Sequence, residues 1–377
     1  MIPCQRHLFD IPDDIAYLNC AYMSPQLRSV TNAGRESTAL KAFPWRITPG
    51  DFFNASDRAR ELCAQVMGAE APDIAIIPAV SYGMAVAAAN VDVPRDSSIV
   101  VLSEQFPSNV YPWKELAREK GANIITVPRP ENWNWTTALL SAIDETMSVV
   151  AVPHCHWTDG TLIDLEKVGD RCREVDAALV LDVTQSLGVL PLPLNSVQPD
   201  FMVTAAYKWL LGPYSTGFLY VAPPHQNGRP LENNWISRIN SEDFANLVNY
   251  SSEYQPGARR FDVGERSNFT LMPLAVAALE QILQWQVPRI AETLSRMTDM
   301  ISKRARELDL AVSPRHLRAG HLLGLRFQQG VPEELPARLS REKVYVSVRG
   351  DCIRVSPYLY NNEGDIDRLF DVLEAVL

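Results

Sequence analysis

The stretch Ala205-Ala206-Tyr207-Lys208-Trp209-Leu210-Leu211-Gly212-Pro213 guides the interpretation of the whole chain. A strand-like run at residues 200–204 precedes it, and it ends in a Gly-Pro turn. Its one charged residue, Lys208, has only apolar and aromatic neighbours. Burial in such surroundings lowers the pKa of an ammonium group and frees the amine to act as a nucleophile. The alternative is an ordinary lysine at a strand end whose amine reaches water, and residues elsewhere in the chain decide between the two.

Outward from Lys208, short apolar strands alternate with helices. Predicted strands cover residues 74–77, 99–102, 124–127, 149–152, 178–183, 201–204 and 217–221, with helices between most of them. Strands that are apolar throughout indicate a mostly parallel sheet with helices on both faces. Ligands bind beyond the carboxyl ends of the strands in such sheets. The residues suited to chemistry fall at these ends: Ser81, Phe106, His154 to Gly160, Asp182 and Lys208.

The pattern changes near residue 274, where long helices lead to short strands and a final helix. We therefore predict a large domain at 26–270 and a smaller α+β domain at 271–377. Residues 1–25 are predicted to be an N-terminal segment that packs near the active site and the small domain. Residues 226–257 are polar and irregular, which indicates an excursion on the surface or at an interface.

The composition excludes several classes of function. The chain has 377 residues, of which 46% are hydrophobic, and a net charge of −10, which argues against nucleic acid or anionic membrane as a partner. It has no 18-residue apolar run and no signal-peptide pattern at its start. Its six cysteines form neither a CxxC nor a zinc-binding pattern, so we expect no metal site. Scattered thiols of this kind are typical of a cytoplasmic protein.

Three residues near the predicted strand ends suit one cofactor. Asp182 ends an apolar strand, Gln185 follows it, and Lys208 lies after the next strand, 26 residues beyond Asp182. Pyridoxal 5'-phosphate requires a lysine for its Schiff base and a carboxylate that keeps its ring nitrogen protonated. Ser81-Tyr82-Gly83 at a helix start would supply a hydroxyl and N–H groups for the phosphate, although alone it is commonly only a cap and turn. Together, the order and spacing predict a pyridoxal-phosphate site.

With these motifs, the chain resembles the fold-type I pyridoxal-phosphate enzymes of the class V aminotransferase family. That group includes cysteine desulfurases, kynureninases and isopenicillin N epimerase-like proteins. The resemblance runs from Tyr17-Leu18-Asn19 to residues 365–369. It implies a three-layer transferase fold with a seven-stranded, mostly parallel sheet in the large, cofactor-binding domain. It also implies a homodimer with the active site at the subunit interface.

The resemblance assigns roles around the cofactor. Lys208 would carry the Schiff base, Asp182 would pair with the pyridine nitrogen, and Gln185 would hydrogen-bond the ring hydroxyl. Phe106, in Glu104-Gln105-Phe106-Pro107-Ser108-Asn109, would stack on the ring. The phosphate would be held by Ser81, the N–H groups of Tyr82 and Gly83, and Tyr207. Residues 260–268 resemble a segment that reaches the neighbouring subunit's phosphate, here through Ser267 or Asn268.

Three further residues would bind the substrate. Ile353-Arg354-Val355-Ser356-Pro357 matches the segment whose arginine binds the substrate α-carboxylate, which a guanidinium grips through two parallel hydrogen bonds. The alternative for Arg354 is a surface ion pair. Trp157 would line the pocket, and Asn19 would approach the substrate. For His154 a core position is favoured over catalysis, and Asp159 is left without a role.

Departures from the family pattern bear on the reaction. Cysteine desulfurases carry a nucleophilic cysteine on a loop before the carboxylate-binding arginine, and residues 341–350 contain none. A persulfide mechanism is therefore disfavoured. We predict an aminotransferase-type reaction on an amino acid, with a lyase (kynureninase-like or C–S) or an epimerase as alternatives. A nicotinamide-binding protein is disfavoured because no G-x-G-x-x-G turn follows the first strand.

Overall fold

A seven-stranded sheet forms the centre of the computed structural model, which describes residues 1–377. Its order is β2 (Ile74–Ile77), β8 (Gly217–Val221), β7 (Phe201–Ala205), β6 (Ala178–Asp182), β5 (Met147–Pro153), β3 (Ser98–Leu102) and β4 (Asn123–Val127). The five strands from β7 to β4 are parallel, and β8 is antiparallel to both its neighbours. The predicted, mostly parallel sheet is confirmed.

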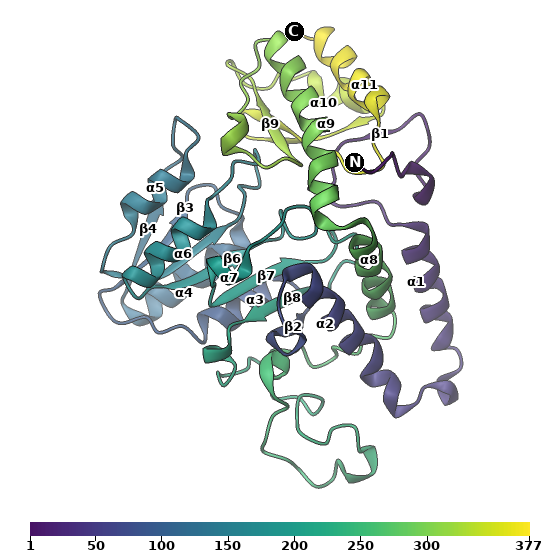
Figure 1. Ribbon diagram of the computed structural model, residues 1–377, viewed down its shortest axis with the longest axis vertical. Coiled ribbons are helices and arrows are strands. Elements are labelled where there is room, and N and C mark those ends of the chain that lie inside the picture. Colours follow the sequence, from purple (N-terminus) through teal and green to yellow (C-terminus); the bar gives the residue numbers. More distant parts are fainter.

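Helices cover both faces of this sheet and make the three layers of the fold (Figure 1). One face packs on α2 (Asn54–Met67), α5 (Trp135–Ala142), α6 (Leu165–Glu174) and α7 (Leu194–Val197), and the other on α3 (Val80–Ala88) and α4 (Tyr111–Lys120). Alternate strand residues enter two separate hydrophobic clusters, so that Leu181 lies in one and Val180 in the other. This two-sided burial explains why the strands are apolar throughout.

A second, smaller sheet lies in the C-terminal part of the chain. Its antiparallel order is β11 (Ser347–Arg349), β12 (Cys352–Val355) and β9 (Leu323–Arg326). Around it lie α9 (Val287–Glu307), α10 (Leu335–Arg341) and α11 (Glu363–Glu374). One face of this sheet buries Leu323, Leu325, Ile353 and Val355 in a third hydrophobic cluster, which residues of α9 and α11 complete.

The N-terminal segment joins this smaller unit. Strand β1 (Ala16–Tyr17) pairs in parallel with β10 (Val344–Tyr345), and Leu18 enters the third cluster. Helix α8 (Leu271–Trp285) packs instead against α1 (Arg28–Leu40) and α2, and its buried residues belong to the core of the large sheet. The domain limits at 25 and 270 remain a prediction.

Residues 226–257 form an irregular projection at the bottom of Figure 1. Trp235 and Phe244 pack edge-on against Phe52, whereas Tyr250 is 95% exposed.

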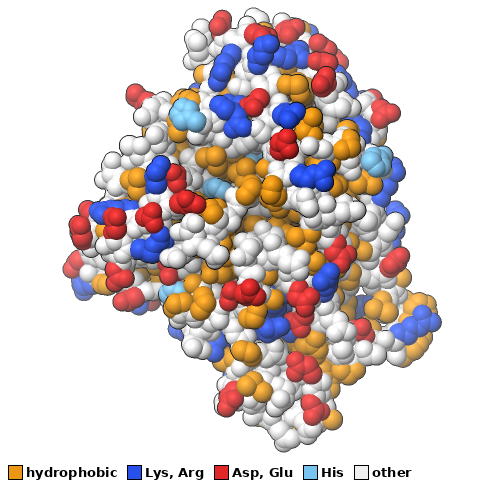
Figure 2. Space-filling view, in the orientation of Figure 1, with side chains coloured by type: hydrophobic (Ala, Val, Ile, Leu, Met, Phe, Trp, Pro, Cys, Tyr) orange, Lys and Arg blue, Asp and Glu red, His pale blue; other side chains and the backbone are white.

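On the face shown in Figure 2, acidic and basic side chains are interspersed. No helix in the chain combines the length and apolar character that crossing a membrane requires. Short 3-10 helices cover Arg6–Leu8, Pro44–Arg46, Pro49–Phe52, Ala71–Asp73, Pro107–Asn109, Pro223–His225, Phe244–Asn246, Gly257–Phe261 and Arg315–Leu317.

Candidate active site

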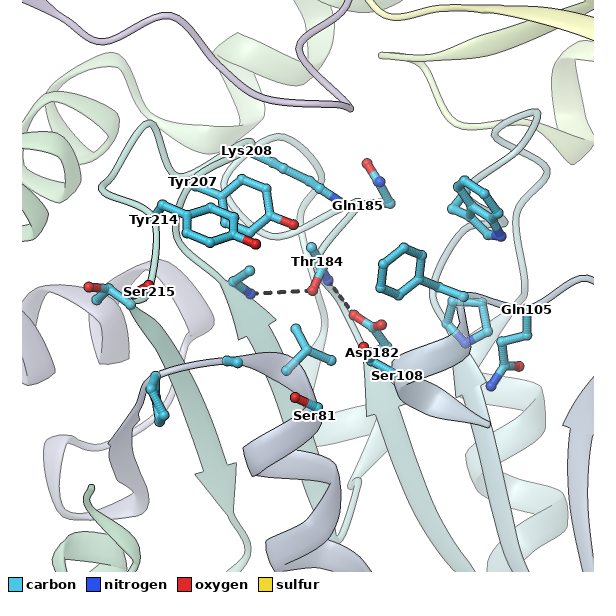
Figure 3. A pocket seen from close by; sticks show the side chains of 18 of the residues that line it. Ser81, Gln105, Ser108, Asp182, Thr184, Gln185, Tyr207, Lys208, Tyr214 and Ser215 are labelled. Carbon is cyan, nitrogen blue, oxygen red and sulfur yellow. Dashed lines mark hydrogen bonds between the residues drawn. The ribbon is translucent and has the colours of Figure 1, made fainter. Parts of the chain in front are cut away.

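A pocket of about 240 Å³ opens at the carboxyl ends of β5, β6 and β7, beside the start of α3 (Figure 3). Parallel strands end at one edge of the sheet, so residues far apart in the sequence meet there. Most of the site residues expected from the sequence line this pocket: Ser81, Phe106, Trp157, Asp182, Gln185, Tyr207 and Lys208. Tyr82, Gly83, Asn19, Asn268 and Arg354 do not.

Lys208 extends into the pocket from the turn that follows β7. Its side chain is 6% exposed, and its Nζ makes no hydrogen bond or ion pair. The Nζ lies 5.3 Å from the ring centroid of Phe106 and 5.5 Å from that of Tyr207. Burial lowers the pKa of Lys208 to about 8, against the opposing effect of Asp182 and with a further contribution from two arginines, Arg354 and Arg349. The amine is therefore buried rather than directed to water.

Asp182, the last residue of β6, offers one free carboxylate oxygen. Its Oδ1 accepts a hydrogen bond of 2.9 Å from the Thr184 N–H, and Thr184 Oγ1 accepts one from the Ala205 N–H (Figure 3). Asp182 Oδ2 has no partner, and burial raises the pKa of the carboxyl group. A ligand that carries an N–H⁺ group would supply the partner that this buried acid lacks.

The Gln185 side chain is held from two sides. Its Nε2 donates to the Ala21 carbonyl at 3.1 Å, and its Oε1 accepts from Trp209 Nε1 at 2.8 Å. One Nε2 proton remains for a ligand hydroxyl, as the sequence-based expectation requires.

Hydroxyl groups gather at the other end of the pocket. Thr216 Oγ1 is buried without a partner, and Ser81 Oγ makes no hydrogen bond. The rings of Tyr207 and Tyr214 lie 4.7 Å apart, and Figure 3 shows their hydroxyls directed toward the pocket interior. Sequence reasoning missed Tyr214 and Thr216, although both follow the Gly-Pro turn after Lys208. Unpaired hydroxyls of this kind fit a phosphate group.

The expectation for Tyr82 and Gly83 needs correction. Their N–H groups donate to the Ala79 carbonyl at 3.1 and 3.2 Å, so they are not free to hold a phosphate. A Cβ on Gly83 would lie 2.8 Å from side-chain atoms of Ile77 and Val203. The glycine therefore allows α3 to pack closely on the sheet. Only the first N–H groups of a helix lack intrahelical acceptors, and here these belong to Val80 and Ser81.

Two aromatic rings form the opposite wall. Phe106 and Trp157 meet edge-to-face with centroids 5.6 Å apart, and Trp157 Nε1 donates to the Glu104 carbonyl at 2.7 Å. Arg129 fixes the segment that carries Trp157, because it pairs with Glu104 at 2.7 Å and with Asp159 at 2.5 Å. Asp159, for which the sequence predicts no role, thus anchors the wall.

His154 is partly buried and does not line the pocket, and its Nδ1 is buried with no partner. Burial lowers its pKa to about 4, which keeps the imidazole neutral. The neutral imidazole, outside the pocket lining, argues against catalysis, whereas the core position favoured from the sequence is only partly reached.

Arg354 lies behind this wall on β12. Its side chain is 1% exposed, and its Nη1 donates to the Trp157 carbonyl at 2.7 Å. Its Nε and Nη2 are buried with no partner, and no acidic group lies within ion-pair distance. Burial, together with Arg349, lowers the pKa of Arg354 to about 9. The surface ion pair considered from the sequence is wrong, and a buried cation without a partner suits a carboxylate ligand.

The remaining expected residues lie outside the pocket. Asn19 Oδ1 accepts a hydrogen bond of 2.8 Å from Ser347 Oγ. The backbone of Asn19 forms a β-bridge with Ser356, which follows β12, the strand of Arg354. The Asn19 Nδ2 makes no hydrogen bond. Asn268 is exposed and accepts from the Leu271 N–H at 3.0 Å. Ser267 Oγ donates to the Phe52 carbonyl at 2.7 Å. Neither Ser267 nor Asn268 reaches the pocket of its own chain.

Comparisons with known proteins found a matching family model, similar sequences and a similar fold. The family model described as aminotransferase class-V matches residues 48–369. An uncharacterized aminotransferase of Bacillus subtilis (strain 168) is 23% identical, over 90% of this chain and 88% of its own. Isopenicillin N epimerase of Streptomyces clavuligerus is 22% identical, over 85% and 84%. A cysteine desulfurase of Thermococcus onnurineus NA1 has the same fold, with a TM-score of 0.86 at 17% identity over 100% and 99% of the chains.

Proposed function

Because the chain belongs to the class V aminotransferase family, a family of pyridoxal-phosphate enzymes, we propose that it transfers the amino group of an amino acid to a 2-oxo acid. The observation that carries this proposal is the buried, unpaired amine of Lys208. It is the one amine among the pocket-lining residues, which include no imidazole. Transamination needs only one base, because the proton that leaves the substrate α-carbon moves to another atom on the same face of the substrate.

The residues of the pocket fit pyridoxal 5'-phosphate. The free Oδ2 of Asp182 would pair with the pyridine nitrogen, and Phe106 would lie against the ring. The Ser81 and Thr216 hydroxyls, with Tyr207 and the N–H groups at the start of α3, would hold the phosphate. When bound, the cofactor supplies an aldehyde for the Lys208 amine and a ring that accepts electrons.

The chain's own residues would divide the remaining work. Arg354 would fix the α-carboxylate, which orients the α-hydrogen toward Lys208. The Lys208 amine would take that proton, because its lowered pKa of about 8 keeps roughly a tenth of it unprotonated at pH 7, far more than for an ordinary lysine. Phe106 and Trp157 would exclude water from this side of the pocket.

The alternatives receive less support from the site. Cys20, Cys155 and Cys352 are buried, and burial raises the pKa of each thiol, which disfavours a nucleophilic thiolate and a persulfide reaction. An epimerase needs a second base on the opposite face of the substrate. Across from Lys208 the wall carries the Phe106 ring. A lyase of the kynureninase or C–S type remains the second candidate, because it shares the first proton abstraction.

A product analysis separates these reactions. The purified protein, loaded with pyridoxal phosphate, is mixed with single amino acids and a 2-oxo acid acceptor. We expect the 2-oxo acid of the donor to form in equal amount to the new amino acid, without ammonia. Release of ammonia or a side-chain fragment would favour the lyase, and loss of α-carbon chirality alone would favour the epimerase.

Cofactor uptake should depend on pH through Lys208. The amine reacts only when unprotonated, and burial lowers its pKa from 10.5 to about 8. The uptake rate of the apo-protein should therefore fall about tenfold per pH unit below pH 8 and level off above it.

The folded state also holds the Lys208 proton less tightly than the unfolded state does. The free energy of unfolding should therefore rise between pH 8 and pH 10.5. Lys208→Met should lack this rise in the free energy of unfolding. In the uptake experiment, a cofactor uptake rate that still increases at pH 10 would contradict the lowered pKa of Lys208.

We also propose that the protein works as a homodimer. Asn268 is exposed outside its own pocket, and Tyr214, at the pocket's edge, is also exposed. Trp45, Val248 and Tyr250 are large apolar side chains open to water, of the kind that an interface covers. Sedimentation should show a dimer, and a fully active monomer would contradict it.

A further inference from the structure

A second arginine shares the strand face that carries Arg354. In the antiparallel pair of β11 and β12, Arg354 lies opposite Ser347, and Arg349 lies opposite Cys352. Residues of a strand alternate between its faces, so both arginines project from the same side of the small sheet. That side meets the large domain, because a Cβ on Gly324 of β9 would lie 2.8 Å from Asp159 Cβ. Ile353 and Val355, on the other side, belong to the hydrophobic core.

Arg349 has no acidic partner. Its guanidinium lies over the Trp157 ring, 5.2 Å from the centroid, and its Nη1 donates only to the neighbouring Val348 carbonyl at 2.7 Å. Its Nε is buried with no partner. By contrast, Arg326 on the same face pairs with Asp351 at 3.1 Å.

The two acids of the wall are already paired. Arg129 holds both Glu104 and Asp159, so neither is left to neutralise a second cation. Besides burial, the positive charges of Arg354 and Arg349 help to lower the pKa of the Lys208 amine. One residue, Trp157, connects them to the pocket. Its carbonyl binds Arg354, and its ring lies under Arg349.

We propose that Arg349 binds a second anionic group of the substrate, so that the preferred substrate is an amino acid with an acidic side chain. This inference rests on the proposed function. An α-carboxylate forms two parallel hydrogen bonds with one guanidinium, here Arg354. A second carboxylate on the same substrate would pair with Arg349, the other arginine on this face that has no acidic partner.

Matched acid and amide substrates test this assignment. Glutamate and glutamine, or aspartate and asparagine, have nearly the same shape and differ in one charge. For the wild-type holoenzyme, we expect kcat/KM for the acid to exceed that for the amide by about 10–100-fold, the effect of one hydrogen-bonded charge pair. Arg349→Gln should remove this preference by lowering the value for the acid and leaving that for the amide within about threefold. Arg326→Gln, on the same face but paired with Asp351, is the matched control and should keep the preference.

Binding without turnover gives a second readout. Glutarate, which has two carboxylates, should raise the Tm of the wild-type protein more than butyrate does, and this difference should disappear in Arg349→Gln. A wild-type enzyme that prefers amides or neutral amino acids would overturn this inference but not the proposed function. An Arg349→Gln variant that loses activity toward acid and amide equally would also overturn it. Arg349 would then serve the α-carboxylate or be neutralised by the partner subunit. If no amino acid reacts, the proposed function fails, and the glutarate comparison still decides the role of Arg349.

Discussion

Replacing Lys208 by alanine should lower the rate of amino-group transfer by about 10⁴-fold or more and abolish covalent attachment of the cofactor. The structure places no other amine or imidazole in the pocket lining, so no second group can take over the proton transfer at the α-carbon. General acid–base catalysis alone contributes about 10²–10⁴-fold, and loss of the covalent link adds to that. Borohydride reduction followed by peptide mass spectrometry should find pyridoxal phosphate on the Lys208 peptide of the wild-type protein.

The fold should survive this substitution. Lys208 makes no hydrogen bond or ion pair, and burial of its charge is unfavourable, so alanine should leave the Tm of the apo-protein unchanged or raised. Lys208→Arg is the matched control, because it keeps the positive charge without a nucleophilic amine and should be as inactive as alanine. A small primary amine in the buffer should restore part of the activity of Lys208→Ala. Turnover within tenfold of the wild type in either variant would contradict the assignment of Lys208.

Replacing Arg354 by methionine should reduce activity while making the protein more stable. Removing a buried, hydrogen-bonded partner of a substrate charge costs about 2–5 kcal/mol, so kcat/KM should fall about 30-fold to 4,000-fold, mainly through a higher KM. The free protein, however, carries Arg354 as a buried cation without an acid. Methionine removes that cost and should stabilise the folded state by about 1–3 kcal/mol, less any loss from the unpaired Trp157 carbonyl.

Urea denaturation of the apo-protein measures the stability effect independently of catalysis. Arg354→Lys should keep part of the activity but lose the bidentate geometry, and it should not gain the stability of methionine. A destabilisation of about 3–5 kcal/mol in Arg354→Met would be the effect of breaking a buried ion pair. That result would show that the guanidinium has an internal acidic partner and is not reserved for a ligand.

Local sequence was sufficient for the large sheet and for much of the site. The run of short apolar strands between helices predicts a parallel sheet, because only such strands are buried on both faces. The order of Asp182, Gln185 and Lys208 places all three at neighbouring strand ends, where the pocket is found. Asp182 ends β6, and Gln185 and Lys208 follow β6 and β7, so their meeting place depends on where these strands end, which can be read from the sequence.

Tertiary structure decided which polar groups are already paired. Helical hydrogen bonding uses the N–H groups of Tyr82 and Gly83 and leaves those of Val80 and Ser81, which motif matching could not distinguish. Helix α8 falls in the predicted small domain by its place in the sequence, and the structure packs it with α1 and α2.

The sequence by itself therefore determined the family, the sheet and the identity of Lys208, Asp182 and Arg354 as candidates. Only the tertiary structure showed that Arg354 and Arg349 are both without acids, while Arg129, Arg326 and Asp159 are neutralised. The physical reason is that strand pattern and motif spacing are local properties, whereas the pairing of a charge depends on groups brought close from distant segments. Asp159 and Arg129 lie 30 residues apart, and Arg354 meets Trp157 across 197 residues.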